Sequence, residues 1–187
     1  MKNPFSGVLD EEIQHIIVPT VDLNEIKTLI ESDQNIIIEF QGKKGRGKST
    51  HLRYLSYYYN WIPSFELNTD SSAQEILATK SDVVFLDSIH HLSFKERKRV
   101  FKEKRIVVYT THRPRILSWR NINKKRIVYY FKGITSQKLE HIIKKRLVFN
   151  NNSDSGNFSY REKDLINKFG DDYRAIITQL YLEYNGK

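Results

Sequence analysis

Apolar runs alternate along the chain with stretches that carry apolar residues at helical spacing, and this pattern predicts an α/β fold. Five short, mostly apolar runs are typical of strands that are buried on both faces. They cover residues 36–40, 65–67, 83–87, 106–109 and 127–131. Amphipathic or charged stretches separate them, as expected for parallel strands joined by crossover helices. We therefore expect a five-stranded parallel sheet flanked by helices.

The pattern changes after Gly133, where only helical stretches remain. The three helices that it predicts cover residues 136–147, 162–169 and 173–184. We therefore expect an α/β core over residues 1–133 and a small all-helical lid over residues 134–187.

Composition excludes several classes of protein. The chain has 187 residues and no cysteine, which excludes a disulfide scaffold and a thiolate zinc site. No apolar run approaches the roughly 20 residues that cross a bilayer, and the N-terminus lacks the apolar core of a signal peptide. We expect a cytoplasmic protein with no membrane segment.

The positive charge is concentrated in one part of the chain. The net charge is +9, yet the stretch from Lys95 to Arg146 holds 18 basic and 3 acidic residues, so the remainder is net negative. Such a stretch is typical of proteins that bind nucleic acid, an anionic ligand or an acidic protein surface. Its role as a DNA-binding surface or as a docking surface for another subunit stays open.

A phosphate-binding loop follows the first predicted strand. Residues 42–49 match the pattern G-x-x-x-x-G-K-[ST] between a strand and a helix. In such a loop the backbone N–H groups surround phosphate oxygens, Lys48 reaches the β- and γ-phosphates, and Ser49 binds Mg²⁺. The predicted ATP-binding residues are Gly42, Lys43, Lys44, Gly45, Arg46, Gly47, Lys48, Ser49 and Thr50.

A carboxylate ends the third predicted strand, where a second magnesium anchor is expected. Asp87 occupies this position, so Ser49 and Asp87 are the predicted metal residues. P-loop ATPases that hydrolyse ATP efficiently commonly carry Glu after this Asp, and here the residue is Ser88. Serine is a poor general base at neutral pH, so we expect slow hydrolysis or another group in this role. The nearby residues His90 and His91 lack the spacing of a zinc site.

The order of these motifs resembles that of the AAA+ P-loop ATPases, most closely their clamp-loader and origin-recognition branch. The run 65–70 is similar to the second strand of that branch, with Asn68 at the position that restrains the catalytic glutamate. The run 109–112 is similar to sensor 1, which touches the γ-phosphate; Thr111 is the first choice and His112 the second. The run 170–174 is similar to the lid motif of sensor 2, with Arg174 facing the phosphates.

The resemblance also implies an arginine finger that reaches a neighbour's nucleotide. Lys125 and Arg126 lie at its expected position before the fifth strand, and Arg113, Arg115 and Arg120 are further candidates. Lys48, Asp87, Thr111, Arg174, Lys125 and Arg126 are thus the expected catalytic set.

The function that we expect is an ATP-dependent switch or weak ATPase that binds ATP and ADP with Mg²⁺. The resemblance implies a homo-oligomer or a partner ATPase subunit, and a DNA-related process such as replication, transposition, or plasmid or phage function. Two alternatives remain: a nucleoside or nucleotide kinase, whose phosphate loop is similar, and a nucleotide-sensing adaptor without turnover. A transporter-type ATPase is disfavoured because its Leu-Ser-Gly-Gly signature is absent from the sequence.

Overall fold

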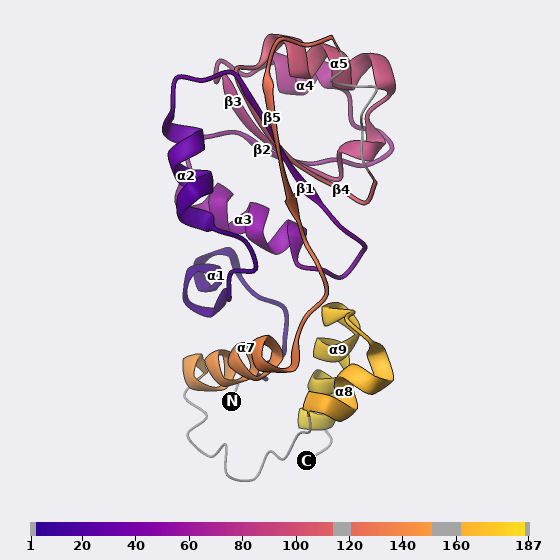
Figure 1. Cartoon of the computed structure of the whole chain (residues 1–187). Helices are drawn as coiled ribbons and strands as arrows, with labels where there is room; N and C mark the ends of the chain where they lie inside the picture. Colours follow the sequence, from indigo (N-terminus) through magenta and orange to yellow (C-terminus); the bar gives the residue numbers. More distant parts are fainter. Residues whose placement is uncertain (1–2, 114–120, 151–161, 186–187) are drawn as a thin grey trace.

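A five-stranded parallel sheet forms the centre of the larger part of the molecule (Figure 1). This computed structural model describes residues 3–113, 121–150 and 162–185. The strands are β1 (Ile36–Gln41), β2 (Ser64–Glu66), β3 (Val83–Asp87), β4 (Ile106–Thr111) and β5 (Lys125–Tyr130). Their order is β2-β3-β4-β1-β5, and every neighbouring pair is parallel. The predicted sheet is confirmed, although β2 begins one residue earlier than expected and β5 two.

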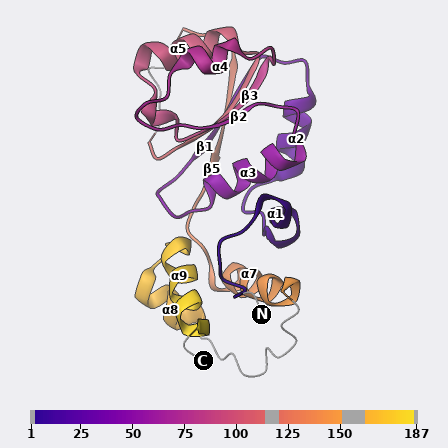
Figure 2. The same ribbon diagram turned by 180° about the vertical axis from the view of Figure 1, so that it is seen from behind.

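Helices cover both faces of this sheet, as Figures 1 and 2 show from opposite sides. One face packs against α2 (Leu23–Glu31) and α3 (Lys48–Tyr58), and the other against α4 (Ala73–Ala78) and α5 (Phe94–Glu103). Alternate residues of each strand therefore enter different cores, because side chains alternate across a sheet.

The β1 residues illustrate this alternation. Ile36, Ile38 and Phe40 pack with Leu52 and Leu55 of α3. The intervening Ile37 packs with the cluster beneath α4 and α5. Both sets are buried, which explains why β1 is apolar from Ile36 to Phe40 except at Glu39.

The charged helix α5 is held to the sheet by few residues. Val100 and Phe101 are its buried side chains, and Ser93 and Glu96 form a capping box at its start. The capping box satisfies backbone N–H groups that the first turn leaves without partners. The basic side chains of Lys95, Lys98, Arg99 and Lys102 on this helix are exposed.

The C-terminal helices have a hydrophobic core of their own. They are α7 (Ser136–Phe149), α8 (Glu162–Phe169) and α9 (Tyr173–Asn185), at the lower end of the molecule in Figure 1. Their buried side chains include Leu139, Ile143, Leu165, Ile176 and Leu180. The predicted all-helical part is confirmed. No helix in the described ranges is long and apolar enough to cross a membrane.

The N-terminal segment packs against these C-terminal helices, which the sequence pattern did not indicate. Phe5 lies in their core, and Arg146 of α7 donates a hydrogen bond to the carbonyl of Pro4 at 3.1 Å. Helix α1 (Asp10–Ile16) contacts both α3 and α7. The segment before α2 therefore connects the two parts, whereas the expected boundary at Gly133 assigned it to the core alone.

Candidate functional site

The loop that joins β1 to α3 lies at the carboxyl end of the sheet. Gly45 and Gly47 have φ of 79° and 82°, in the left-handed region that glycine tolerates and other residues rarely adopt. Helix α3 begins at Lys48, so the loop directs backbone N–H groups and the positive end of the helix at the same space. This geometry is that of an anion-binding loop.

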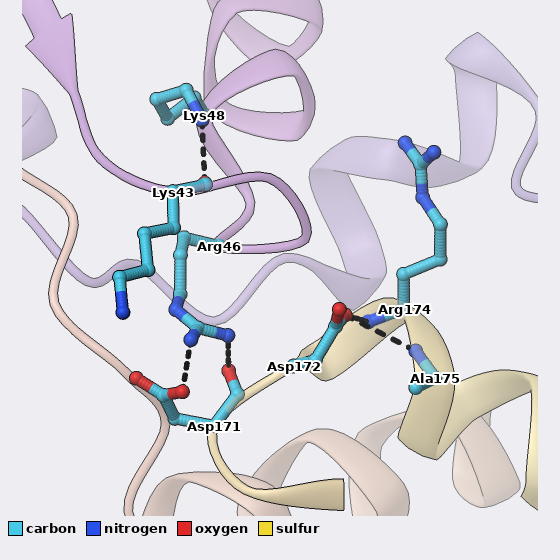
Figure 3. Close-up of polar contacts among 7 residues, drawn as sticks. All are labelled: Lys43, Arg46, Lys48, Asp171, Asp172, Arg174 and Ala175. Atoms are coloured by element: carbon cyan, nitrogen blue, oxygen red, sulfur yellow. Dashed lines mark hydrogen bonds and ion pairs between the residues drawn. The ribbon is translucent and has the colours of Figure 1, made fainter. Parts of the chain in front are cut away.

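Lys48 is a buried cation at the base of this loop. Its side chain is 5% exposed, and its Nζ donates to the carbonyl of Lys43 at 2.7 Å (Figure 3). The Nδ1 of His112 lies 3.3 Å from the same Nζ. Burial lowers the pKa of Lys48 to about 8, Asp87 partly opposes this, and Arg46 lowers it further. The ammonium group is thus poorly solvated, and an anion beside it would be stabilised.

Ser49 and Asp87 lie together beside Lys48. The Oγ of Ser49 donates to Oδ1 of Asp87 at 3.0 Å, and the hydroxyl of Thr110 donates to the same oxygen. Hydroxyl and carboxylate oxygens are ligands that Mg²⁺ prefers, usually together with waters and substrate phosphates. The donor set therefore fits Mg²⁺ shared with a phosphate. No cluster of three or more His, Asp or Glu side chains suited to a metal occurs in the described ranges.

The residue after Asp87 adopts an unusual backbone conformation. Ser88 has φ 62° and ψ 46°, and its N–H donates to the hydroxyl of Thr110 at 2.9 Å. Left-handed conformations at residues other than glycine are uncommon and occur often at functional sites. Thr110 thus holds both Asp87 and the backbone that follows it.

The first choice for the residue that touches the γ-phosphate, Thr111, has its hydroxyl engaged by the backbone that follows it. The Thr111 hydroxyl donates to the carbonyl of Arg113 at 2.8 Å and does not contact Lys48 or Asp87. Its neighbours Thr110 and His112 contact these residues instead, because alternate residues of β4 share a face. The second choice, His112, therefore lies at the site.

Neither residue of the expected finger pair is near this site in its own chain. Lys125 pairs with Ile36 at the amino end of the strands, opposite to the loop. Arg126 binds the buried carboxylate of Glu39, with Nη2 and Nε at 2.8 and 3.0 Å from Oε2. Within its own chain the Arg126 guanidinium therefore neutralises a buried charge. Arg115 and Arg120 lie outside the described residues.

The turn before α9 packs onto the phosphate loop, as Figure 3 shows. Arg46 bonds to both the carbonyl and the carboxylate of Asp171. The carboxylate of Asp172 accepts hydrogen bonds from the N–H groups of Arg174 and Ala175, at 3.0 and 3.2 Å, and so caps α9. This turn therefore positions the first turn of α9, which carries Arg174.

A cavity of about 1090 Å³ lies between the loop, the N-terminal segment, α3 and α9. Lys48, Ser49, Asp87, His112 and Arg174 all line it, so the fold brings these separate predictions to one place. A smaller cavity of about 160 Å³ adjoins the loop at Gly47 and Thr50. Its apolar lining comes from Val8, Ile13, Ile16, Ile17, Val18, Ile134 and Ile142.

One residue beside the site, His51, is not among the residues that the sequence predicts. His51 is buried, donates from Nδ1 to the carbonyl of Gly47 at 2.8 Å and accepts at Nε2 from the N–H of Thr20 at 3.0 Å. Its position four residues after Gly47 on α3 was the only available signal. Asn68 occupies the position expected to restrain a catalytic glutamate. Its Oδ1 accepts a hydrogen bond from the N–H of Asp70 at 2.8 Å and so caps its own turn.

Comparisons with known proteins place the fold but not the family. No family model matches the chain, and no curated protein matches it. Among solved structures, AMPPCP-bound DnaA from Aquifex aeolicus is similar, with 19% sequence identity and a TM-score of 0.61. The replication initiator DnaA bound to AMPPCP and single-stranded DNA is similar with 17% identity and a TM-score of 0.59. The RuvB Holliday junction branch migration motor of Thermotoga maritima is similar at 16% with 0.52.

These matches cover most of this chain and part of the others. Each covers 91% of this chain, 63% of either DnaA chain and 58% of the RuvB chain. At such identities the likeness shows the fold alone. The chain therefore has the fold of the AAA+ P-loop ATPases DnaA and RuvB.

Proposed function

We propose that this protein binds ATP with Mg²⁺ and acts as a slow, nucleotide-dependent switch. The observation that carries the proposal is the convergence of buried Lys48, the Ser49–Asp87 pair and Arg174 on one cavity. A triphosphate would place an anion beside Lys48, whose ammonium forms no ion pair with any of the residues that the structure describes. Bound Mg²⁺ would be held by Ser49 and Asp87 and would neutralise phosphate charge.

The larger cavity would hold the phosphates of the nucleotide and the smaller cavity its base. The loop and the N-terminus of α3 suit the phosphates, and the adjoining apolar cavity suits a purine ring. Val8 of the N-terminal segment and Ile134, directly after Gly133, both line that smaller cavity. A base bound there would contact the N-terminal segment, the core and the helices after Gly133, which we propose act as a lid.

The lid would respond to the nucleotide through Arg174. This residue lies on the first turn of α9 and lines the same cavity as Lys48. Bound ATP should attract the Arg174 guanidinium more strongly than bound ADP does, because ATP carries the additional negative charge of the γ-phosphate. The ATP and ADP complexes would therefore differ in the position of α9, which gives a partner two states to distinguish.

Nucleotide-dependent thermal shift and calorimetry test this proposal. Wild-type protein should bind ATP with Mg²⁺, and Lys48→Ala should lose binding by a factor of 100 or more, as expected for a buried charged partner. Lys163→Ala, on the exposed surface of α8, is the matched control and should bind as wild type does. Equal binding by wild type and Lys48→Ala would contradict the site.

A DNA-related role is proposed on the charge of α5. Lys95, Lys98 and Lys102 are exposed at helical spacing on one face of this helix. Among the similar structures, one DnaA is bound to single-stranded DNA. Three lysines that contact phosphates would contribute about 2 to the slope of log affinity against log salt for a single strand.

The same face could instead dock on an acidic surface of another subunit, and salt dependence separates the two. Replacing the three lysines with Gln should weaken binding of a labelled oligonucleotide and reduce the slope by about 2. The protein partner would be favoured by two results together. Wild type would bind no DNA at low salt, and the variant with the three lysines replaced would lose the self-association that wild type shows in the ultracentrifuge. Lys163→Gln serves as the control in both measurements.

A further inference from the structure

The hydrolytic site has no carboxylate directly after Asp87. Ser88 occupies that position, and its backbone N–H is engaged by Thr110. A serine hydroxyl accepts a proton poorly at neutral pH. Hydrolysis at the proposed nucleotide site therefore needs a base from elsewhere in the cavity.

The neighbouring strand places a glutamate beside Asp87. Glu66 ends β2 and is paired in register with Asp87 of β3, where the N–H of Leu67 donates to the carbonyl of Asp87 at 3.1 Å. Adjacent strands lie about 4.8 Å apart. Glu66 is thus one strand spacing from the proposed metal-side carboxylate, although it is 21 residues away in sequence.

Both side chains lie on the same face of the sheet. The residue before Glu66, Phe65, packs with the cluster beneath α4 and α5, so Glu66 faces the side of α3. Asp87 faces that side as well, because it bonds to Ser49 at the start of α3. Glu66 and Ser88 accordingly line the same cavity as Lys48.

The other acidic side chains of the cavity are already engaged. Its described acidic residues are Asp10, Glu66 and Asp87. Asp10 is bound by Arg53, and Asp87 accepts from Ser49 and Thr110. Glu66 is exposed, and no hydrogen bond or ion pair holds its carboxylate within the described ranges. It is the carboxylate that remains to accept a proton.

We propose that Glu66 is the general base for ATP hydrolysis at this site, an inference that rests on the proposed function. Water attacks the γ-phosphorus, and a water proton passes to the Glu66 carboxylate. The bond between the γ-phosphorus and the β,γ-bridging oxygen breaks, and ADP and inorganic phosphate leave. The glutamate that efficient ATPases carry after the β3 aspartate is thus supplied by β2.

Single-turnover hydrolysis of ATP in the full chain tests this assignment. Glu66→Gln should slow hydrolysis by about 100-fold, within the range for loss of a general base, while the Kd for ATP changes less than twofold. Glu75→Gln, an exposed glutamate on α4, is the matched control and should behave as wild type.

A second variant distinguishes a role of Glu66 as general base from a purely structural role. Adding Ser88→Glu to Glu66→Gln should restore hydrolysis at least tenfold, because a carboxylate returns to the face of the cavity. Unchanged hydrolysis in Glu66→Gln with intact ATP binding would overturn the inference and leave the proposed function standing. ATP binding without any single-turnover hydrolysis in wild type would do the same. Absence of ATP binding in wild type would overturn both.

Discussion

The guanidinium of Arg46, in the phosphate loop, bonds to both the carbonyl and the carboxylate of Asp171, in the turn before α9. The Arg46 side chain is 8% exposed, so this contact is largely shielded from solvent. A side-chain atom added at Gly45 would collide with Asp172, and one at Gly133 with Asp171. The turn is therefore tightly packed against both the loop and the segment at Gly133 that leads into α7.

Arg46→Ala should weaken ATP binding about tenfold even though its side chain is directed at the lid. The reason is that Arg174 loses its fixed position over the cavity when the turn is released; tenfold corresponds to about 1.4 kcal/mol. Calorimetric titration of Arg46→Ala, Asp171→Ala and the double variant measures the coupling. The double variant should bind no more weakly than Arg46→Ala alone, whereas additive losses would show that the contact does not position the lid.

ATP binding should become proton-linked above pH 8, because the pKa of Lys48 is lowered to about 8 by burial. In the free protein the amine loses its proton above that pH, and phosphate binding restores the charge. Affinity should then fall by up to about tenfold per pH unit above pH 8. Calorimetry at pH 9 in two buffers of different ionisation heat should report proton uptake in wild type. The same titration of wild type at pH 7, where the amine already carries its proton, should report no uptake through this group, and equal uptake at pH 7 and pH 9 would contradict this origin.

The same group affects the stability of the nucleotide-free protein with the opposite sign. Since the unfolded chain keeps its Lys48 proton up to about pH 10.5, it binds more protons than the folded chain between pH 8 and 10.5. The contribution of Lys48 to the free energy of unfolding should therefore rise with pH across this window. Urea unfolding at pH 8 and pH 10 should show a smaller rise in Lys48→Met than in wild type.

Acid should destabilise the phosphate loop through His51. Burial lowers the pKa of His51 to about 4, and its Nε2 accepts from Thr20, so the folded protein requires the neutral ring. The folded-state pKa lies below the unfolded value of 6.5, so this stability is present above pH 6.5 and is lost as pH falls toward 4. The loss amounts to about 3 kcal/mol.

Urea unfolding between pH 7 and pH 4.5 measures this effect. His51→Gln should be less stable at pH 7 but should show a shallower dependence on pH than wild type. His141→Gln, on the exposed face of α7, is the control and should keep the wild-type slope. Parallel curves for wild type and His51→Gln would disprove the assignment.

Substitutions of Arg126 and Lys125 should differ sharply in their effect on the free energy of unfolding. Removing Arg126 leaves the fully buried Glu39 carboxylate without its cation, which should cost about 3 kcal/mol. Lys125→Ala changes an exposed side chain and should stay within about 0.5 kcal/mol of wild type. Urea unfolding of Arg126→Met, with and without Glu39→Leu, measures the pair. Failure of Glu39→Leu to recover stability would show that the lost charge partner is not the cause.

The sequence alone determined the elements whose signals are local. The apolar runs of β1, β3 and β4 identified buried strands because both faces of each strand are covered. The glycine spacing between β1 and α3 identified the loop because the backbone there requires left-handed conformations. Asp87 was recognisable because it directly ends an apolar strand.

Tertiary structure decided which of the remaining residues meet at the site. A shift of one residue reverses the face of a strand, so only the structure shows that Thr110 and His112 contact Asp87 and Lys48. The pairing of β2 with β3 placed Glu66 beside Asp87, and the packing of the helices after Gly133 brought Asp171 to Arg46. These relationships join residues far apart in the chain, and they depend on strand register and helix packing, which local patterns of polarity do not encode.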